Sequence, residues 1–232
     1  MILCIETATS VCSVALCSDE KVISVRESKD GKSHSALLTV LINDLLSEQK
    51  IKVENLDAVS VSKGPGSFTG LRIGVSVAKG IAYGAGIPLI GIDTLTSMYY
   101  GFISLPTGKI ELNENTLFCP MIDAKRMEVY YCLFDYSGRR IKEITAEEIT
   151  ADTFSDITAE ITIVFFGDGA GKCSKVIKRN KQIFLNEFQM SAAYMHIPSI
   201  NALKEKKFEN TAYFEPFYLK DFMVTKPRKK LF

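Results

Sequence analysis

The chain has 232 residues and a formal net charge of +1, with 47% hydrophobic and 24% charged residues. These values are typical of globular proteins with ample material for a core, and they exclude extensive disorder. Neither half has the strong excess of Lys and Arg that a protein needs to grip nucleic acid unaided. The composition therefore indicates one large or two small globular domains.

The cysteines and the lengths of the apolar runs indicate in which cellular compartment the protein is expected. None of the six cysteines forms a CxxC pair or matches a zinc spacing, so we expect buried free thiols in a reducing environment. We expect no signal peptide, because a strand pattern begins at residue 2, and no apolar run reaches membrane-spanning length. A cytoplasmic protein without membrane contact is expected.

The first part of the chain is predicted to form a meander followed by a βαβ unit. Strands are expected over residues 2–7, 11–17, 22–27, 57–62 and 89–92. Helices are expected over residues 34–50 and 71–84, with another beginning at Asp93. Tight turns join the first three strands as antiparallel neighbours, whereas the last two should be parallel with a right-handed crossover.

The second part of the chain is predicted to repeat this order. The polar stretch 104–115 contains Pro106 and Gly108 and predicts a boundary between domains 1–104 and 105–232. Further strands are expected over residues 117–122, 127–134, 139–144 and 161–166, and a helix over 199–207. The basic tail 226–230 is expected to be a solvated terminus, or else to contact RNA or an acidic partner.

The two long helices carry more apolar surface than one sheet-facing stripe requires. In the second helix a smooth face of small residues lies about 60–100° from a bulky face of Ile73, Val77 and Ile81. Both faces could be buried within the chain, but two such helices favour a shared docking surface. The expected interface residues are His34, Leu37, Leu38, Leu41, Leu45, Gly74, Ala78, Ala82 and Ala85.

The sequence also suggests a second candidate site, which could bind an anion or nucleotide. The glycine-rich turn at residues 64–70 fits neither the dinucleotide fingerprint nor the P-loop, so it is a structural turn or a simple anion site with Arg72 nearby. Glu6 and Asp123 end the first strands of the two halves and could bind Mg²⁺ in a shared cleft, or hold turns. The candidates are Glu6, Thr7, Gly64, Gly66, Ser67, Thr69, Gly70, Arg72, Asp123, Gly167 and Gly169.

The segments IETATS, GPGSFTGLRIGVSVAKGIA, PLIGIDTL and MIDAKRMEVYY resemble the TsaB family, also called YeaZ. Its members are accessory subunits of the bacterial machinery that places threonylcarbamoyl on adenosine in tRNA. The resemblance implies an α/β fold of two actin/Hsp70-like halves (the ASKHA, RNase H-like class), each a mixed sheet with an antiparallel meander and flanking helices. It also implies the partners TsaD, a catalytic paralogue, and TsaE, an ATPase. A homodimer is expected when the chain is alone, and tRNA is reached only through the complex.

Departures from the catalytic relatives indicate a non-catalytic role. Those relatives carry Asn-His-x-x-Gly-His after the corresponding strand, whereas this chain has Thr94 and Met98 at the histidine positions, so no metal site is expected. Asp123 to Arg126 stand where ATPases have a glycine-rich phosphate turn, although Gly167 to Gly171 still resembles an adenosine-side loop.

The resemblance therefore predicts a non-catalytic subunit of the t6A37 transferase complex that binds and activates TsaD. It requires no cofactor, with at most weak ATP or ADP and Mg at the complex interface. The alternative is a stand-alone actin-fold ATPase or small-molecule kinase with Glu6 and Asp123 as Mg²⁺ ligands.

Overall fold

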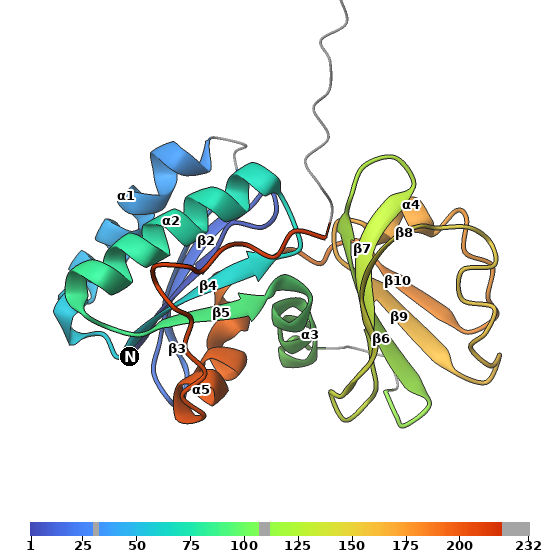
Figure 1. Cartoon of the computed structure of the whole chain (residues 1–232). Coiled ribbons are helices and arrows are strands. Elements are labelled where there is room, and N and C mark those ends of the chain that lie inside the picture. The colour runs from blue at the N-terminus through green and yellow to red at the C-terminus, as the bar shows by residue number, and fades with distance from the viewer. Residues whose placement is uncertain (30–32, 107–111, 220–232) are drawn as a thin grey trace, which may run out of the picture.

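The computed structural model describes residues 1–29, 33–106 and 112–219, which form two α/β halves, each built around a five-stranded sheet (Figure 1). The first half contains β1 (Ile2–Glu6), β2 (Cys12–Cys17), β3 (Val22–Ser28), α1 (His34–Glu48), η1 (Val53–Asn55), β4 (Ala58–Gly64), α2 (Phe68–Ala85), β5 (Leu89–Asp93) and α3 (Thr94–Ser104). The strand order is β3-β2-β1-β4-β5, in which β1 to β3 are antiparallel and β1, β4 and β5 are parallel.

The second half repeats this topology, as the order of elements predicted. It contains β6 (Thr116–Asp123), β7 (Glu128–Phe134), β8 (Arg140–Glu148), β9 (Thr162–Phe166), α4 (Ala170–Cys173) and β10 (Gln182–Leu185). The order β8-β7-β6-β9-β10 has the same parallel and antiparallel pairs as the first sheet. The two halves differ in their helices, because α4 has 4 residues where α2 has 18.

The chain then returns to the first half, which corrects the expected single boundary. α3 ends at Ser104, where the boundary was placed, but η2 (Ala192–Met195) and α5 (His196–Lys204) pack in one cluster with Ile2 and Ile90 of the first sheet. Residues 208–218 follow and are called the C-terminal strap below; they contain one β-bridge, at Glu209, and a turn at residues 211–213. Residues 192–218 therefore belong structurally to the first half, while the basic tail lies outside the described residues.

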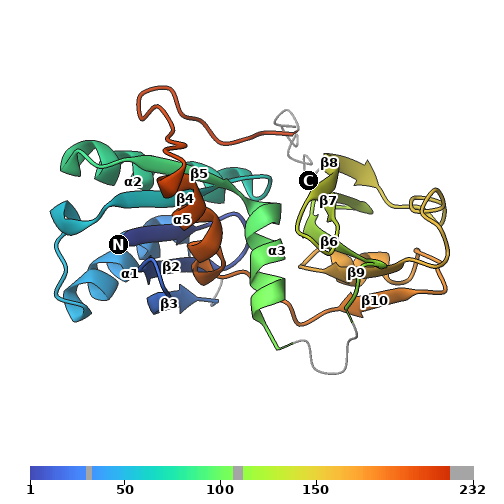
Figure 2. The same cartoon turned by 90° about the horizontal axis from the view of Figure 1, so that it is seen from below.

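Helices cover both faces of the first sheet and α3 lies between the two sheets (Figure 2). α1 and α2 pack on one face of the first sheet through Leu38, Leu45 and Ala78, and α5 packs on the other. All six cysteines are free and buried, as expected. Among the described helices, none has the length and apolar character needed to cross a bilayer.

Candidate partner surface and inter-half cleft

The orientation of α2 decides which of its two apolar faces is accessible. Ala78 and Ala82 are buried against the sheet, and Gly74 lies so close to Thr7 that a Cβ atom would be 2.2 Å from the Thr7 hydroxyl. The smooth face of the helix is thus the face that meets its own sheet, because small residues permit close approach there. The expectation that Gly74, Ala78 and Ala82 face a partner is wrong.

The outward side of α2 carries another stripe of small residues. Ser76, Gly80 and Gly84 follow one another at a spacing of four and are exposed. A Cβ atom at Gly80 or Gly84 would meet no other heavy atom within 4 Å. The bulky residues Val77 and Ile81 flank this stripe and are only partly buried. This part of the helix is open to a second protein.

α1 continues this surface next to α2. Val40 is 50% exposed, whereas the expected interface residues Leu38 and Leu45 are fully buried in the core. We call the combined area the two-helix surface; its residues are Ala36, Thr39, Val40, Asn43, Ser47, Ile73, Ser76, Val77, Gly80, Ile81 and Gly84. Its residues are all uncharged, and all are partly or fully exposed.

A groove of about 500 Å³ adjoins this surface, between the C-terminal part of α1, residues 51–54 and the middle of α2, and its lining includes the charged residues Lys52 and Glu54. Ile42 and Leu46 of α1 line it together with Val77 and Ile81 of α2. The remaining expected interface residues lie beside the surface: Leu37 and Leu41 pack partly against the first core, and Ala85 is half-buried at the end of α2. The structure therefore keeps the predicted helix pair but changes which of its residues are available.

His34 belongs to a different place, the cleft between the halves. Its Nε2 lies 3.0 Å from the carbonyl oxygen of Thr9, so the first residue of α1 is tied to the β1–β2 turn. The cleft has a volume of about 500 Å³. Its lining comes from both halves and comprises Ala8, Thr9, Ser10, His34, Gly66, Ser67, Phe68, Ile122, Asp123, Ala124, Lys125, Tyr130 and Asp168.

Glu6 does not face this cleft as the Mg²⁺ hypothesis requires. It is fully buried, and its Oε1 accepts hydrogen bonds from the Ala8 amide at 2.6 Å and the Ser62 hydroxyl at 3.0 Å. Its Oε2 has no hydrogen-bond partner in the described chain. Burial raises the pKa of Glu6 to about 7, although these hydrogen bonds act to lower it. Glu6 thus holds the β1–β2 turn, which was the alternative expectation.

The glycine-rich turn packs against that same β1–β2 turn. A Cβ atom at Gly66 would lie 2.4 Å from the Ala8 carbonyl oxygen, and one at Gly70 would lie 2.0 Å from the Thr7 carbonyl oxygen. Ser67 caps α2 by accepting a hydrogen bond from the Gly70 amide at 3.3 Å. Close backbone approach explains these glycines, and Gly64 adopts a φ of 110°.

Arg72 is turned away from the cleft and towards the C-terminal strap. Its guanidinium carbon lies 3.9 Å from the centre of the Phe68 ring, and its Nε donates to the Tyr218 hydroxyl at 3.0 Å. Thr69 is exposed in the first turn of α2 and, like Arg72, does not line the cleft. Arg72 is therefore not available to the anion site that was expected at the start of α2.

Asp123 reaches the cleft but is engaged by lysines. Lys172 of α4 donates to one of its carboxylate oxygens and Lys125 lies 3.7 Å from the other. Burial acts to raise the pKa of Asp123, but the hydrogen bond and charge of Lys172, helped by Lys125, outweigh it and lower the pKa. The neighbouring Asp168 accepts a hydrogen bond from the Asp123 amide at 3.0 Å, and burial raises its pKa.

Close packing also accounts for Gly167 and Gly169. Gly167 has a φ of 105°, and a Cβ atom there would be 2.3 Å from the Met121 carbonyl oxygen. A Cβ atom at Gly169 would be 2.9 Å from the Ile122 carbonyl carbon. These glycines hold the β9–α4 turn against β6, and of this loop Asp168 lines the cleft.

The two positions that correspond to the metal-binding histidines of the catalytic paralogue are buried. Thr94 is fully buried and Met98 is 1% exposed in the core cluster between α3 and the second sheet. Within the described residues, no group of three or more His, Cys, Asp and Glu side chains could hold a metal ion.

Two features of the cleft were missed by sequence reasoning. Thr9 and Ser10 line it because they directly follow β1, and the rule that ligands gather at the carboxyl ends of parallel strands could have indicated them. Lys172 carried no such signal, since its contact with Asp123 joins residues 49 positions apart in the sequence.

Two repeated halves with this strand order and a cleft between them define a protein of the actin-like class. The solved structure of YeaZ from Pseudomonas aeruginosa has the same fold, with a TM-score of 0.79 over 94% of this chain and 99% of that chain at 21% identity. The family described as "TsaD: tRNA N6-adenosine threonylcarbamoyltransferase" matches residues 25–223.

Comparison with proteins of similar sequence identifies the family within this class. The chain is 30% identical to the Escherichia coli tRNA threonylcarbamoyladenosine biosynthesis protein TsaB over 95% of this chain and 94% of that protein. It is also 32% identical to a tRNA N6-adenosine threonylcarbamoyltransferase of Fervidobacterium nodosum, over 46% of this chain and 36% of that enzyme. This chain therefore belongs to the TsaB family of tRNA threonylcarbamoyladenosine biosynthesis proteins.

Proposed function

We propose that this chain is a non-catalytic subunit of the t6A37 transferase complex that binds and activates the catalytic paralogue TsaD. The observation that carries the proposal is the two-helix surface, which presents 11 uncharged positions on two adjacent helices. The centres of protein interfaces are depleted in charged residues and packed as tightly as protein interiors. A surface of this kind is more typical of a protein interface than of a solvent-exposed face.

The stripe of small residues indicates how a helix of the partner would pack on α2. A helix of the partner would lie along Ser76, Gly80 and Gly84, where α2 carries no side chain longer than that of serine, while Val77 and Ile81 fill the adjoining grooves. The exposed Tyr83 borders this stripe on its other side. Two helices on each protein would form a four-helix interface. The same surface would form a homodimer when TsaD is absent. TsaE would join the pair, and tRNA would be reached through the complex.

The environment of the carboxylates supports a role without catalysis. A stand-alone ATPase or kinase would use Glu6 and Asp123 as Mg²⁺ ligands, but Glu6 is covered and Asp123 already has a lysine counterion. The positions of the paralogue's histidines hold Thr94 and Met98, which do not bind metal as imidazoles do. Weak ATP or ADP contact with Mg at the complex interface stays a prediction, for which calorimetry on the assembled complex is the test. Free buried cysteines fit a cytoplasmic location.

Reconstitution tests the proposal directly. We expect threonylcarbamoyl transfer to tRNA by TsaD and TsaE to depend on this chain, and the purified chain to show no such transfer by itself. Equal transfer with the chain omitted would contradict the accessory role. Turnover of Mg-ATP by the chain alone would favour the ATPase hypothesis.

A further inference from the structure

The internal repeat gives the molecule two equivalent edge strands, β5 and β10, with different surroundings. The C-terminal strap covers the outer side of β5: Glu209 forms an antiparallel bridge with Leu89, and its amide donates to the Leu89 carbonyl at 2.8 Å. In the part of the chain that the structure describes, no strand pairs with β10 on the side away from β9. An edge strand of this kind presents unpaired N–H and C=O groups to any extended segment.

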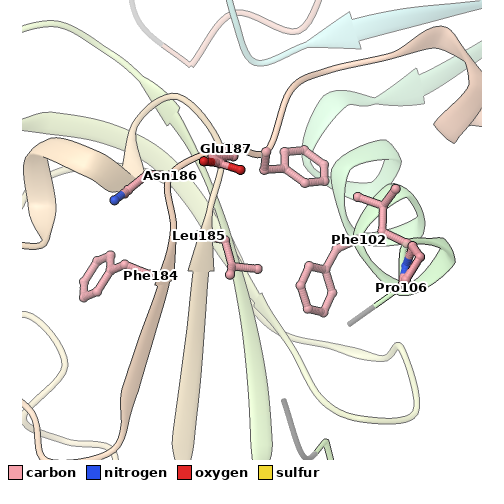
Figure 3. A pocket seen from close by; sticks show the side chains of 8 residues that line it. Phe102, Pro106, Phe184, Leu185, Asn186 and Glu187 are labelled. Carbon is pink, nitrogen blue, oxygen red and sulfur yellow. The ribbon is translucent and has the colours of Figure 1, made fainter. Parts of the chain in front are cut away.

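A cavity of about 520 Å³ adjoins this open edge. It is lined by the end of α3 and by the end of β10 with the loop that follows; its residues are Phe102, Leu105, Pro106, Phe184, Leu185, Asn186, Glu187 and Phe188. Figure 3 shows Leu185 pointing towards Phe102, while Phe184 points the other way. Consecutive strand residues point to opposite faces, so a cavity lined by both wraps around the edge of the sheet.

The chemistry of the lining restricts what fits the cavity. Most of it is apolar, and Leu105 at its rim is 41% exposed. The exposed carboxylate of Glu187 forms no ion pair with any described residue, so a positively charged group of an incoming molecule would complement it.

The first half shows how the equivalent sheet edge is covered by another segment of the chain. The strap places the Phe214 ring against Gly91 of β5, where the side chain is only 8% exposed. Its Glu209 pairs with Lys63 of β4 at 3.3 Å. The strap is thus held at β5 by a backbone bridge, one aromatic anchor and one ion pair. Further hydrogen bonds hold it beyond this point, from Lys79 to the carbonyls of Ala212 and Phe214 and from the Phe217 amide to the Lys63 carbonyl. The surroundings of β10 offer counterparts of the first three elements, with the charge reversed.

We propose that β10 binds an extended segment of a partner protein, which adds to the second sheet as a further strand. A bulky apolar side chain of that segment occupies the cavity, and a neighbouring Lys or Arg pairs with Glu187. Main-chain hydrogen bonds supply affinity in such strand addition, and the side-chain pocket supplies specificity. The proposal is independent of the two-helix surface, which lies on the other half of the molecule.

The test uses the full ¹⁵N-labelled chain and the synthetic peptide acetyl-TKVFV-amide. We expect the amide resonances of Gln182–Leu185 to shift on titration to millimolar peptide. The same peptide with N-methylated backbone amides should not produce these shifts, since it cannot donate to the strand. Absence of shifts in β10 at millimolar peptide would overturn the proposal, as would equal binding of the N-methylated peptide.

A second experiment reverses the charge of Glu187. Glu187→Lys should weaken binding of the lysine peptide by about three- to ten-fold and should make acetyl-TEVFV-amide the better ligand. Asp19→Lys, which reverses an exposed charge in the first half, serves as the matched control and should change neither affinity. An unchanged peptide preference in the Glu187→Lys variant would show that Glu187 does not contact the added strand.

Discussion

Lys172 occupies the position of a counterion to Asp123 in the cleft between the halves. Its ammonium group donates to an Asp123 carboxylate oxygen and also to the backbone carbonyls of Arg126 and Glu128, at 2.8 and 2.6 Å. One ammonium group thus contacts three oxygen atoms at this edge of the second sheet. Its charge compensates the carboxylate that ends β6.

Removal of this ammonium group should destabilise the chain in a pH-dependent way. Lys172→Met should lower the free energy of unfolding by about 1–3 kcal/mol at pH 7, because a charge-assisted hydrogen bond is lost. The pKa of Asp123 is lowered in the folded state, so its contribution is present above the unfolded pKa and disappears as pH falls through the folded value. The difference between the two proteins should therefore shrink in acid.

Urea unfolding at pH 7 and at pH 3 measures this effect. Lys175→Met is the control, since Lys175 is exposed on the same segment and forms no ion pair with a described residue. A difference that stays constant with pH would mean that Asp123 is not the group that Lys172 stabilises.

Glu6 should give the opposite pH dependence. Its folded pKa of about 7 lies above the usual value of 4.5, so its contribution to stability is fully present below the unfolded pKa and is lost as pH rises through 7. At 1.36 kcal/mol per unit, the loss between pH 4.5 and pH 8 amounts to about 3 kcal/mol. Glu6→Gln stays neutral throughout and should remove this slope.

Chemical denaturation at pH 5 and pH 8 compares the two proteins. The Glu6→Gln variant should be more stable than the wild type at pH 8 and should lose that advantage at pH 5. Parallel stability curves would indicate that Glu6 is not buried as a neutral acid.

Substitutions at Gly80 should change binding to the partner without unfolding the chain. A Cβ atom there meets nothing, so Gly80→Ala should raise the stability of the isolated chain by about 0.5–1 kcal/mol, as expected for a helix interior. Gly80→Arg should also leave the chain folded but should abolish co-purification with TsaD, because a long charged side chain would stand between the helices.

Circular dichroism and co-purification distinguish these outcomes. Ala78→Arg is the contrasting variant: Ala78 is fully buried, so this change should unfold the chain rather than block docking selectively. If Gly80→Arg formed the complex as well as Gly80→Ala does, the two-helix surface would not be the interface with TsaD.

Arg140 joins the second half to the start of α3. Its Nη2 donates to Asp93 Oδ2 at 2.6 Å and to the Thr96 hydroxyl at 2.7 Å, and Asp93 also caps α3. Arg140→Met should cost about 1–3 kcal/mol of unfolding free energy, because partly buried polar groups lose their partner. Arg139→Met, at the exposed neighbouring position, should cost less than about 1 kcal/mol. Equal costs in urea unfolding would show that the contact between the halves contributes nothing beyond a surface ion pair.

The sequence predicted most of the fold but only part of the candidate site. Alternating apolar residues and glycine turns placed β1 to β9 within a few residues, except that β8 continues to Glu148, beyond the predicted end at residue 144. β10 was missed, since its four residues carry too little pattern to stand out from a lysine-rich segment. Helix α5 begins at His196 rather than at Ser199, because Pro198 is tolerated in the first turn of a helix.

The amino-acid sequence by itself determined the two repeated halves, the helix pair and the family, because these depend on local periodicity and on motifs read along the chain. The tertiary structure decided which face of α2 is free, where Lys172 meets Asp123, and that the strap returns to β5. Helical periodicity shows that a helix has two apolar faces but not which one meets the sheet. That choice depends on how closely α2 can approach Thr7, and only contacts between residues distant in sequence settle it.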